Sequence, residues 1–449
     1  MNEQNQTSDV KGTVMRLIRN PWLTATTALV IGIAVGLTSQ VQAENEARLP
    51  IDEVRLMSQI LERIKQSYVE EVTDEELFES AIEGMLSGLD PHSDYLTPDD
   101  FKELRESTSG EFGGLGIEIV LDETGYVRVV APIDDTPAYR AGMQSGDLIT
   151  KIDDTPVKGM TINDAVTLMR GKPKTDIVLT IARDGENGPI EVEITRDIIK
   201  ITSVRSRMLE DGYGYVRISQ FQERTGPDFI TAIKSLREDA DGDLKGMVLD
   251  LRNNPGGVLQ ASVDVVDALI SEGLIVYTEG RAANSDSRFN ARSSDPSEGV
   301  NLVVLINGGS ASASEIVAGA VQDHKRGLIM GTQSFGKGSV QTILPLDKDH
   351  AIKLTTARYY TPSGRSIQAQ GIVPDVIVKP GKLTQQDGDP YYKESDLAGS
   401  LNNTQTTDDE QSEAEADKEV EEENLAERDY QLYQALTMLK GIAFFNAAK

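Results

Sequence analysis

The chain has 449 residues, of which 39% are apolar and 26% charged, and its formal net charge is −29. This length suggests roughly three domains of ~150 residues, with enough apolar residues for ordinary cores. The acidity argues against nucleic-acid binding, because neutralising phosphates requires clustered Lys and Arg. The chain has no cysteine, which excludes disulfides, cysteine nucleophiles and thiolate metal sites. It has only three histidines, too few to favour a histidine-based metal cluster, so we expect no metal and no other cofactor.

The first 43 residues have the pattern of a signal peptide. Lys11, Arg16 and Arg19 precede an apolar stretch over residues 22–37, and residues 41–43 supply the small side chains that a signal peptidase reads. We therefore expect export to a bacterial periplasm. An uncleaved anchor in the inner membrane is the alternative, since the apolar stretch is only slightly shorter than the ~20 residues of a spanning helix.

The segment after the signal peptide has a helical pattern. Apolar residues recur at three- and four-residue spacing over residues 51–89, and the phrase LDPHSDYLTPDD then ends the pattern because Pro91 and Pro98 lack a backbone N–H. We assign residues 44–108 to an N-terminal helical region.

Residues 113–183 resemble a PDZ domain. The run Gly114-Leu115-Gly116-Ile117 opens an alternating strand, and VRVVAPI, TPAYRAGMQSGDLITKIDD and the helical TINDAVTLMRG follow it. Glycines let successive N–H groups converge on a carboxylate, while the adjoining strand can accept an extended peptide at its edge. We predict a PDZ-like domain over residues 109–190 that binds chain termini; a small barrel whose glycines only turn corners is the alternative.

Three buried strands each run into a turn rich in glycine. The strands are predicted over residues 245–252, 301–306 and 328–330, and the turns read NNPGG, NGGS and GTQSFGKG. If these strands are parallel, all three turns lie at one edge of the sheet, where open α/β sheets bind ligands. Serines, glycines and a lysine would meet there.

The second and third turns offer a nucleophile and a base. Ser310, Ser312 and Ser314 form a cluster, and Lys337 lies between two glycines. A lysine can take a proton from a serine only if desolvation lowers its pKa from ~10.4 towards neutrality. Two structural alternatives stay open at this point: Ser312 could cap a helix in a box with Glu315, and Lys337 could be an exposed loop residue.

The developing oxyanion of an acyl transfer needs backbone N–H donors. The turn at Gly256-Gly257 and the helix start near Ala313 are natural suppliers. A Ser-His-Asp triad fails, because His324 lies twelve residues beyond Ser312, roughly 18 Å along a helix. A phosphate-binding loop ending in Lys337 also fails, because glycine follows where Ser or Thr is required.

Several motifs together resemble the carboxyl-terminal processing peptidases, the tail-specific serine proteases. They are LDPHSDYL, the PDZ-like segment, DLRNNPGG, NGGSASASE, SFGKGSVQ, TTARYYTPSGRSIQ and GIVPD, and they extend over residues 51–380. The resemblance implies a Ser-Lys dyad of Ser312 and Lys337, 25 positions apart, with Gln341 orienting the lysine. It also implies an oxyanion hole from the backbone amides of Ala313 and the Gly256-Gly257 turn.

The resemblance further implies the fold class: an α/β multidomain protein with a crotonase-like ββα core and an inserted PDZ-like domain that can open or cover a substrate tunnel. We assign the catalytic core to residues 191–382 and an acidic linker to residues 383–428. Residues 408–429 hold twelve acids against two basic residues, a pattern typical of a solvated tail. An amphipathic helix over residues 429–449 would pack on the body or mediate oligomerisation.

The predicted function is that of a serine endopeptidase that cleaves near the C-terminus of exported proteins through an acyl-enzyme. Its partners would be proteins or peptides with accessible C-termini, and an adaptor protein and a homo-oligomer stay open. The alternative function is a non-catalytic, PDZ-type peptide-binding scaffold.

Overall fold

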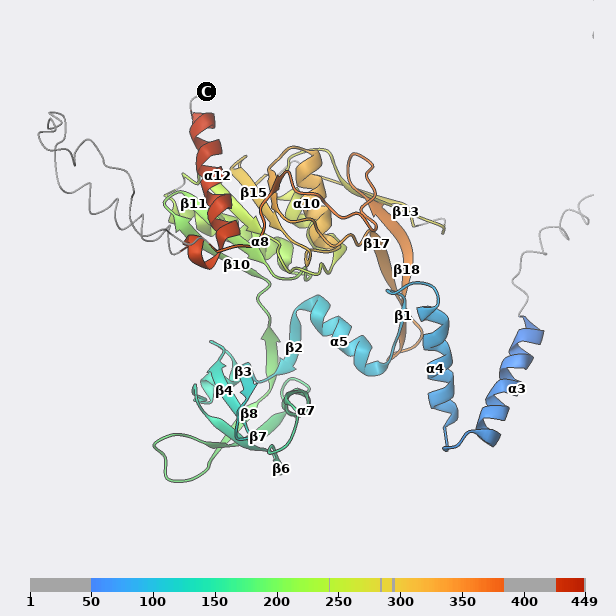
Figure 1. Cartoon of the computed structure of the whole chain (residues 1–449). Helices are drawn as coiled ribbons and strands as arrows, with labels where there is room; N and C mark the ends of the chain where they lie inside the picture. The colour runs from blue at the N-terminus through green and yellow to red at the C-terminus, as the bar shows by residue number, and fades with distance from the viewer. Residues whose placement is uncertain (1–49, 242, 283–284, 293–294, 383–424, 448–449) are drawn as a thin grey trace, which may run out of the picture. The chain divides into compact units, whose positions relative to one another are not determined.

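The computed structural model describes residues 50–241, 243–282, 285–292, 295–382 and 425–447 (Figure 1). The chain divides into two units, residues 1–82 and 83–449. The predicted signal peptide and nearly all of the predicted acidic linker lie outside the described residues. Within the described residues, no helix combines the length and the apolar character that crossing a membrane requires.

The predicted N-terminal helices are present as α3 (Ile51–Ser67) and α4 (Asp74–Ser87). After α4 the chain turns at Pro91 and forms the short strand β1 (Asp94–Leu96). Helix α5 (Pro98–Ser109) then begins at Thr97, whose hydroxyl accepts the N–H of Asp100 in a capping box. Thus Pro98, which the sequence pattern places at a break, starts the next helix, where its missing N–H costs nothing.

The PDZ-like segment has its own sheet and its own core. The sheet order is β3-β4-β5-β7-β8, with β6 paired to β5, and β3 lies at an edge. Its buried side chains, such as Val127, Ile149 and Leu179, form a cluster separate from the rest of the protein. The elements are β3 (Ile117–Leu121), β4 (Val127–Pro132), α6 (Pro137–Arg140), β5 (Leu148–Ile152), β6 (Thr155–Pro156), α7 (Ile162–Met169), β7 (Asp176–Ala182) and β8 (Ile190–Thr195). Strands β2 (Glu111–Gly114) and β9 (Asp197–Lys200) pair antiparallel where the chain enters and leaves this segment.

A six-stranded sheet forms the centre of the remaining chain, in the order β10-β11-β12-β15-β16-β19. From β11 onward all neighbours are parallel, so the three predicted strands are parallel and their turns share one edge. The strands are β10 (Val204–Glu210), β11 (Tyr213–Ile218), β12 (Gly246–Asp250), β15 (Asn301–Ile306), β16 (Leu328–Gly331) and β19 (Val376–Ile377).

Helices cover both faces of this sheet, which explains why its strands are apolar throughout. Helices α8 (Thr225–Asp239), α9 (Leu259–Asp267) and α10 (Ala313–Asp323) share a core with alternate strand residues such as Leu249 and Val304. The intervening residues, such as Val248 and Val303, pack with Leu432 and Leu439 of α12 (Tyr430–Ala447) on the other side. The predicted C-terminal helix therefore packs on the body.

A second sheet has the order β1-β18-β13-β14, with β17 also paired to β18. Its other strands are β13 (Leu274–Gly280), β14 (Ser287–Asn290), β17 (Ser339–Pro345) and β18 (Ala351–Tyr360). Strands β17 and β18 form a long antiparallel hairpin, and β1 pairs with β18 on its other side (Figure 1). This hairpin carries residues that face the predicted dyad.

Candidate active site

Ser312 lies at the sharp turn between β15 and α10. Its φ of +54° and ψ of −113° are unusual for a residue with a side chain. Such strain persists only where the surroundings enforce it, and it is typical of functional sites. Ser312 is also the N-cap residue of α10, and its N–H donates to the Glu315 carboxylate, which is the Glu315 half of the predicted capping box. A capping position and a place in the cavity described below are therefore compatible.

The other two serines of the cluster are structural. Ser310 and Ser314 are fully buried. The hydroxyl of Ser310 donates to the carbonyl oxygen of Leu251 at 2.8 Å, and that of Ser314 donates to the carbonyl oxygen of Asn254 at 2.9 Å. Both hydroxyls therefore bind the β12 turn, and only Ser312 is available to a substrate.

The carboxylate of Glu315 joins the serine turn to the lysine loop. This fully buried side chain accepts the N–H groups of Ser312 at 2.8 Å, Gly336 at 2.7 Å and Lys337 at 2.9 Å. It also accepts the hydroxyl of Ser334 at 2.6 Å. Burial raises the pKa of Glu315, and these hydrogen bonds oppose the rise. Glu315 thus sets the backbone positions of both predicted dyad residues at once.

The side chain of Lys337 is half-buried, and its surroundings disfavour its charge. Burial lowers its pKa first, and the positive charge of Lys353 lowers it further, against the opposing charges of Asp90 and Glu315. Its carbonyl oxygen accepts the hydroxyl of Tyr359, whose ring is almost completely buried. Burial raises the pKa of Tyr359 well above its ordinary value, so the phenol stays protonated and can donate.

Ser312, Lys337 and Gln341 line one cavity of about 380 Å³. Its apolar lining includes Leu104, Ile316, Val340 and Ile343, and Gly257 and Tyr359 also border it. Among the described residues no hydrogen bond joins the side chains of Ser312 and Lys337. Catalytic hydrogen bonds are often long without substrate, so this geometry is compatible with a dyad.

Gln341 lies on β17 with its amide nitrogen engaged. Nε2 donates to the hydroxyl of Ser339 at 3.0 Å and to that of Thr355 at 3.1 Å. The amide oxygen has no hydrogen-bond partner among the described residues, so it is available to a lysine.

The predicted oxyanion donors differ in availability. The N–H of Gly256 already donates to Oδ1 of Asn254 at 2.9 Å, which argues against the prediction that Gly256 is a donor. The N–H groups of Gly257 and Ala313 have no partner within the described parts of the chain. Gly257 has a φ of +137°, and a Cβ there would lie 2.1 Å from the carbonyl oxygen of Phe221, so only glycine fits.

The predicted carboxylate-binding loop lies at the start of edge strand β3. Gly114 ends β2, Leu115 is buried and Ile117 begins β3. Gly116 has a φ of +77°, and its carbonyl oxygen accepts the hydroxyl of Thr136 at 3.1 Å. The N–H groups of Leu115 and Gly116 have no partner in the described structure, and β3 has a free edge, as an incoming peptide strand would require.

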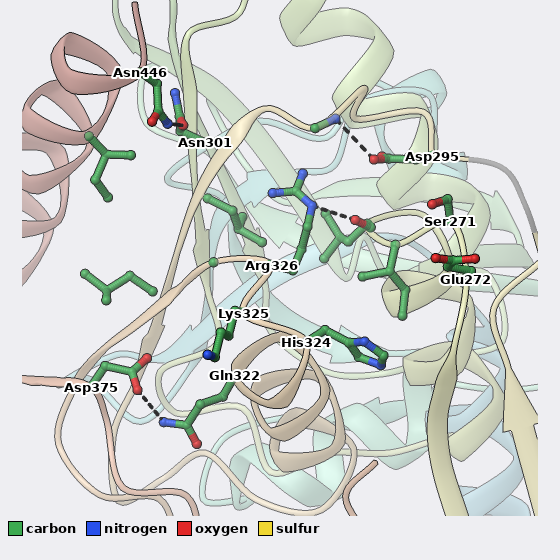
Figure 2. A pocket seen from close by; sticks show the side chains of 17 residues that line it. Ser271, Glu272, Asp295, Asn301, Gln322, His324, Lys325, Arg326, Asp375 and Asn446 are labelled. Carbon is green, nitrogen blue, oxygen red and sulfur yellow. Dashed lines mark hydrogen bonds between the residues drawn. The ribbon is translucent and has the colours of Figure 1, made fainter. Parts of the chain in front are cut away.

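Another cavity, of about 830 Å³, lies at the far end of α10 (Figure 2). His324, Lys325 and Arg326 line it, together with residues distant in the sequence such as Asp375 and Asn446. None of the predicted site residues reaches it. His324 is therefore separated from Ser312 by the length of α10, as the helical spacing predicts.

Sequence reasoning missed three side chains near the dyad: Asp90, Thr355 and Tyr359. Asp90 belongs to the phrase LDPHSDYL, and an Asp followed two and three residues later by N–H groups that it accepts is a recognisable turn signal. Thr355 and Tyr359 belong to the motif TTARYYTPSGRSIQ, but their partners come from distant segments, which no local pattern indicates.

Comparisons with known proteins identify the family of the chain. Residues 212–378 match Peptidase family S41, residues 128–183 match the PDZ domain and residues 24–99 match the Activating protease CtpB N-terminal domain. A carboxy-terminal-processing protease of Bartonella bacilliformis is 51% identical over 351 residues, covering 78% of this chain and 80% of the relative. The carboxy-terminal processing protease CtpA of Bacillus subtilis is 32% identical over 382 residues, covering 83% and 80%.

Among solved structures, a photosystem II D1 C-terminal processing protease is 32% identical, covering 71% of this chain and 86% of that one. Its TM-score is 0.42, too low for the structural likeness to add to the sequence match. The identity and coverage of the relatives are sufficient by themselves. The chain belongs to peptidase family S41 and is a carboxy-terminal-processing serine protease with a PDZ domain.

Proposed function

We propose that Ser312 is the nucleophile, Lys337 the general base and Gln341 the residue that orients the lysine. The observation that carries this proposal is the burial of Lys337 in the cavity that Ser312 borders, where desolvation and Lys353 lower the lysine pKa. A neutral lysine at working pH is what a Ser-Lys dyad requires.

In the proposed reaction, Nζ of Lys337 takes the proton of the Ser312 hydroxyl as Oγ attacks the scissile carbonyl carbon. The N–H groups of Gly257 and Ala313 stabilise the oxyanion. The lysine ammonium then gives its proton to the leaving amine as the C–N bond breaks, leaving an ester on Ser312. Lys337 next takes a proton from water as the water oxygen attacks the ester carbon. The bond between that carbon and Ser312 Oγ then breaks, the lysine ammonium returns the proton to Oγ, and the new C-terminus is released.

We further propose that the substrates are exported proteins, held by their C-termini at residues 114–117 and the edge of β3. The N–H groups of Leu115 and Gly116, which have no partner among the described residues, support this role for the PDZ domain. The signal pattern supports a periplasmic location. The predicted domain boundaries remain part of this proposal, as do an adaptor protein and a homo-oligomer.

The proposal is tested by cleavage of an unstructured peptide by the purified wild type, Ser312→Ala and Lys337→Ala. Both variants should be inactive while keeping the circular dichroism of the wild type. Full activity in either one rules out the dyad. A serine-directed fluorophosphonate distinguishes the protease from the alternative of a non-catalytic scaffold. It should label Ser312 of a protease covalently, because only an activated serine reacts, and it should not label a scaffold.

A further inference from the structure

A chain of polar contacts leads from the turn after α4 to the predicted orienting residue. Oδ1 of Asp90 accepts the hydroxyl of Thr355 at 3.0 Å. The same hydroxyl oxygen receives Nε2 of Gln341 at 3.1 Å, and Nε2 also donates to Ser339. Asp90 and Thr355 are 265 positions apart, so the fold alone brings them together.

The number of protons on each group decides which residue donates and which accepts in these hydrogen bonds. Burial alone would raise the pKa of Asp90, but hydrogen bonds from Ser93, His92 and Thr355 outweigh it and lower the pKa. The carboxylate is therefore ionised at neutral pH and can only accept. Thr355 has a single hydroxyl proton and must donate it to Asp90, so its oxygen must accept from Gln341.

This direction decides which way the amide of Gln341 faces. Its NH₂ group must point to Thr355 and Ser339, so its oxygen points away from them. Without such a constraint the two ends of a side-chain amide are nearly interchangeable in shape, and either could face the lysine. An NH₂ group facing Lys337 could not accept a hydrogen bond from it.

A second contact holds the turn on β18. The hydroxyl of Ser93, which is almost completely buried, donates to Oδ2 of Asp90 at 2.7 Å and accepts the N–H of Thr355 at 3.1 Å. Asp90 is thus bound to β18 directly through Oδ1 and by way of Ser93 through Oδ2, and the pairing of β1 with β18 continues the attachment.

We propose that Asp90 and Thr355 are positioning residues: they fix the orientation of the Gln341 amide so that its oxygen stays available to Lys337. This inference rests on the proposed role of Gln341. It assigns a function to the LDPHSDYL segment, which lies outside the core sheet and outside the PDZ domain.

The test compares kcat and KM for one peptide across substitutions on β18. Thr355→Val keeps the shape but removes the hydroxyl, so we expect kcat to fall about tenfold with KM within twofold of wild type. Thr355→Ser should restore kcat. The matched control is Thr356→Val, because the Thr356 hydroxyl lies 2.6 Å from that of Thr342 on β17 and does not contact Asp90 or Gln341.

Two further variants separate positioning from simple structural damage. Asp90→Asn can donate as well as accept, which allows the chain of hydrogen bonds to reverse, so it should lower kcat as Thr355→Val does. In a Gln341→Ala background, Thr355→Val should cause no additional loss, because the residue that it orients is gone.

The inference is overturned if Thr355→Val keeps kcat within twofold of wild type, if Thr356→Val loses as much, or if Thr355→Val lowers kcat equally in the Gln341→Ala background. Its failure differs from failure of the proposed function. Inactive Ser312→Ala and Lys337→Ala beside a fully active Thr355→Val would remove only this inference, whereas an active Ser312→Ala would remove the dyad itself.

Discussion

Helix α10 has a cavity at each end, and the two differ in how far their half-buried polar side chains are satisfied. At its C-terminal end lies the larger cavity, which Arg326 lines (Figure 2). The guanidinium of Arg326 donates to the carbonyl oxygens of Leu269 at 2.6 Å and Val300 at 2.8 Å and to the hydroxyl of Ser297 at 2.8 Å. Asp375 likewise accepts from Gln322 and from the backbone of Ile329.

At the N-terminal end, in the smaller cavity, groups that bind and transfer protons are left available. The amide oxygen of Gln341 and the N–H groups of Gly257 and Ala313 have no partner in the described parts of the chain, and the surroundings of Lys337 disfavour its charge. The comparison teaches that volume does not identify the active site here. The active site is identified instead by polar groups that the fold holds in place without a hydrogen-bond partner among the described residues.

The largest effect that should separate the two cavities is the loss of Ser312. Ser312→Ala should lower kcat/KM by about 10⁴-fold or more, because the nucleophile is removed. Ser314→Ala is the matched control; it removes a structural hydrogen bond and should cost about 1 kcal/mol of stability while leaving kcat within a few-fold of wild type. Peptide cleavage and urea unfolding measure the two effects, and equal losses of activity would contradict the assignment.

A second large effect concerns the pH dependence that Lys337 imposes. Activity should rise with pH as Lys337 loses its proton, because only the neutral amine accepts the proton of Ser312. Lys337→Met should lower kcat by about 10³-fold and abolish this rise. A pH profile of kcat/KM for both proteins measures it; the same rise in Lys337→Met would assign the titration to another group.

The same substitution should stabilise the fold. Because burial lowers the pKa of Lys337 in the folded state, the unfolded chain binds more protons between the folded pKa and about 10.4, and wild-type stability rises with pH across that window. Lys337→Met should therefore have the higher melting temperature at neutral pH, with a difference that shrinks as pH rises. A difference that grew with pH would contradict the lowered pKa.

A smaller effect is expected from Tyr359→Phe. This change removes the hydroxyl that donates to the carbonyl oxygen of Lys337, so the lysine loop loses one anchor while the buried ring is kept. We expect kcat to fall about tenfold and KM to change little. Unchanged kcat would mean that the other hydrogen bonds of the loop, including those to Glu315 and Gln368, are sufficient to hold Lys337 in place.

The larger cavity should affect stability and not catalysis. Arg326→Ala leaves three acceptors without their donor and should cost about 3 kcal/mol, measured by urea unfolding. The folded fraction should keep kcat within twofold of wild type, and His324→Gln should do the same. A tenfold loss of kcat in His324→Gln would reopen a histidine mechanism.

The sequence could predict those features of the structure that depend on residues close together in the chain. The strands β12, β15 and β16 were predictable because helices cover both faces of the sheet, which makes the strands apolar without alternation. The engagement of Gly256 by Asn254 was also within reach, since an Asn two residues before a glycine in a turn accepts its N–H. Spacing alone left the three serines equivalent, and the family resemblance chose Ser312.

The rest depends on contacts between distant segments. Asp90 reaches Thr355 only because β1 pairs with β18, and Glu315 joins two loops that follow different strands. The positive φ of Ser312 results from the same arrangement, since serine has no intrinsic preference for it. No periodicity or motif spacing reports such contacts.

The most direct test of the dyad is the rate at which a fluorophosphonate acylates the protein as a function of pH, with the labelled residue identified by mass spectrometry. We predict a single adduct on Ser312, a rate that rises with pH in the wild type and a rate that is low and flat in Lys337→Met. Labelling of Ser310 or Ser314, or an unchanged rate in Lys337→Met, would contradict the proposed Ser312–Lys337 pair.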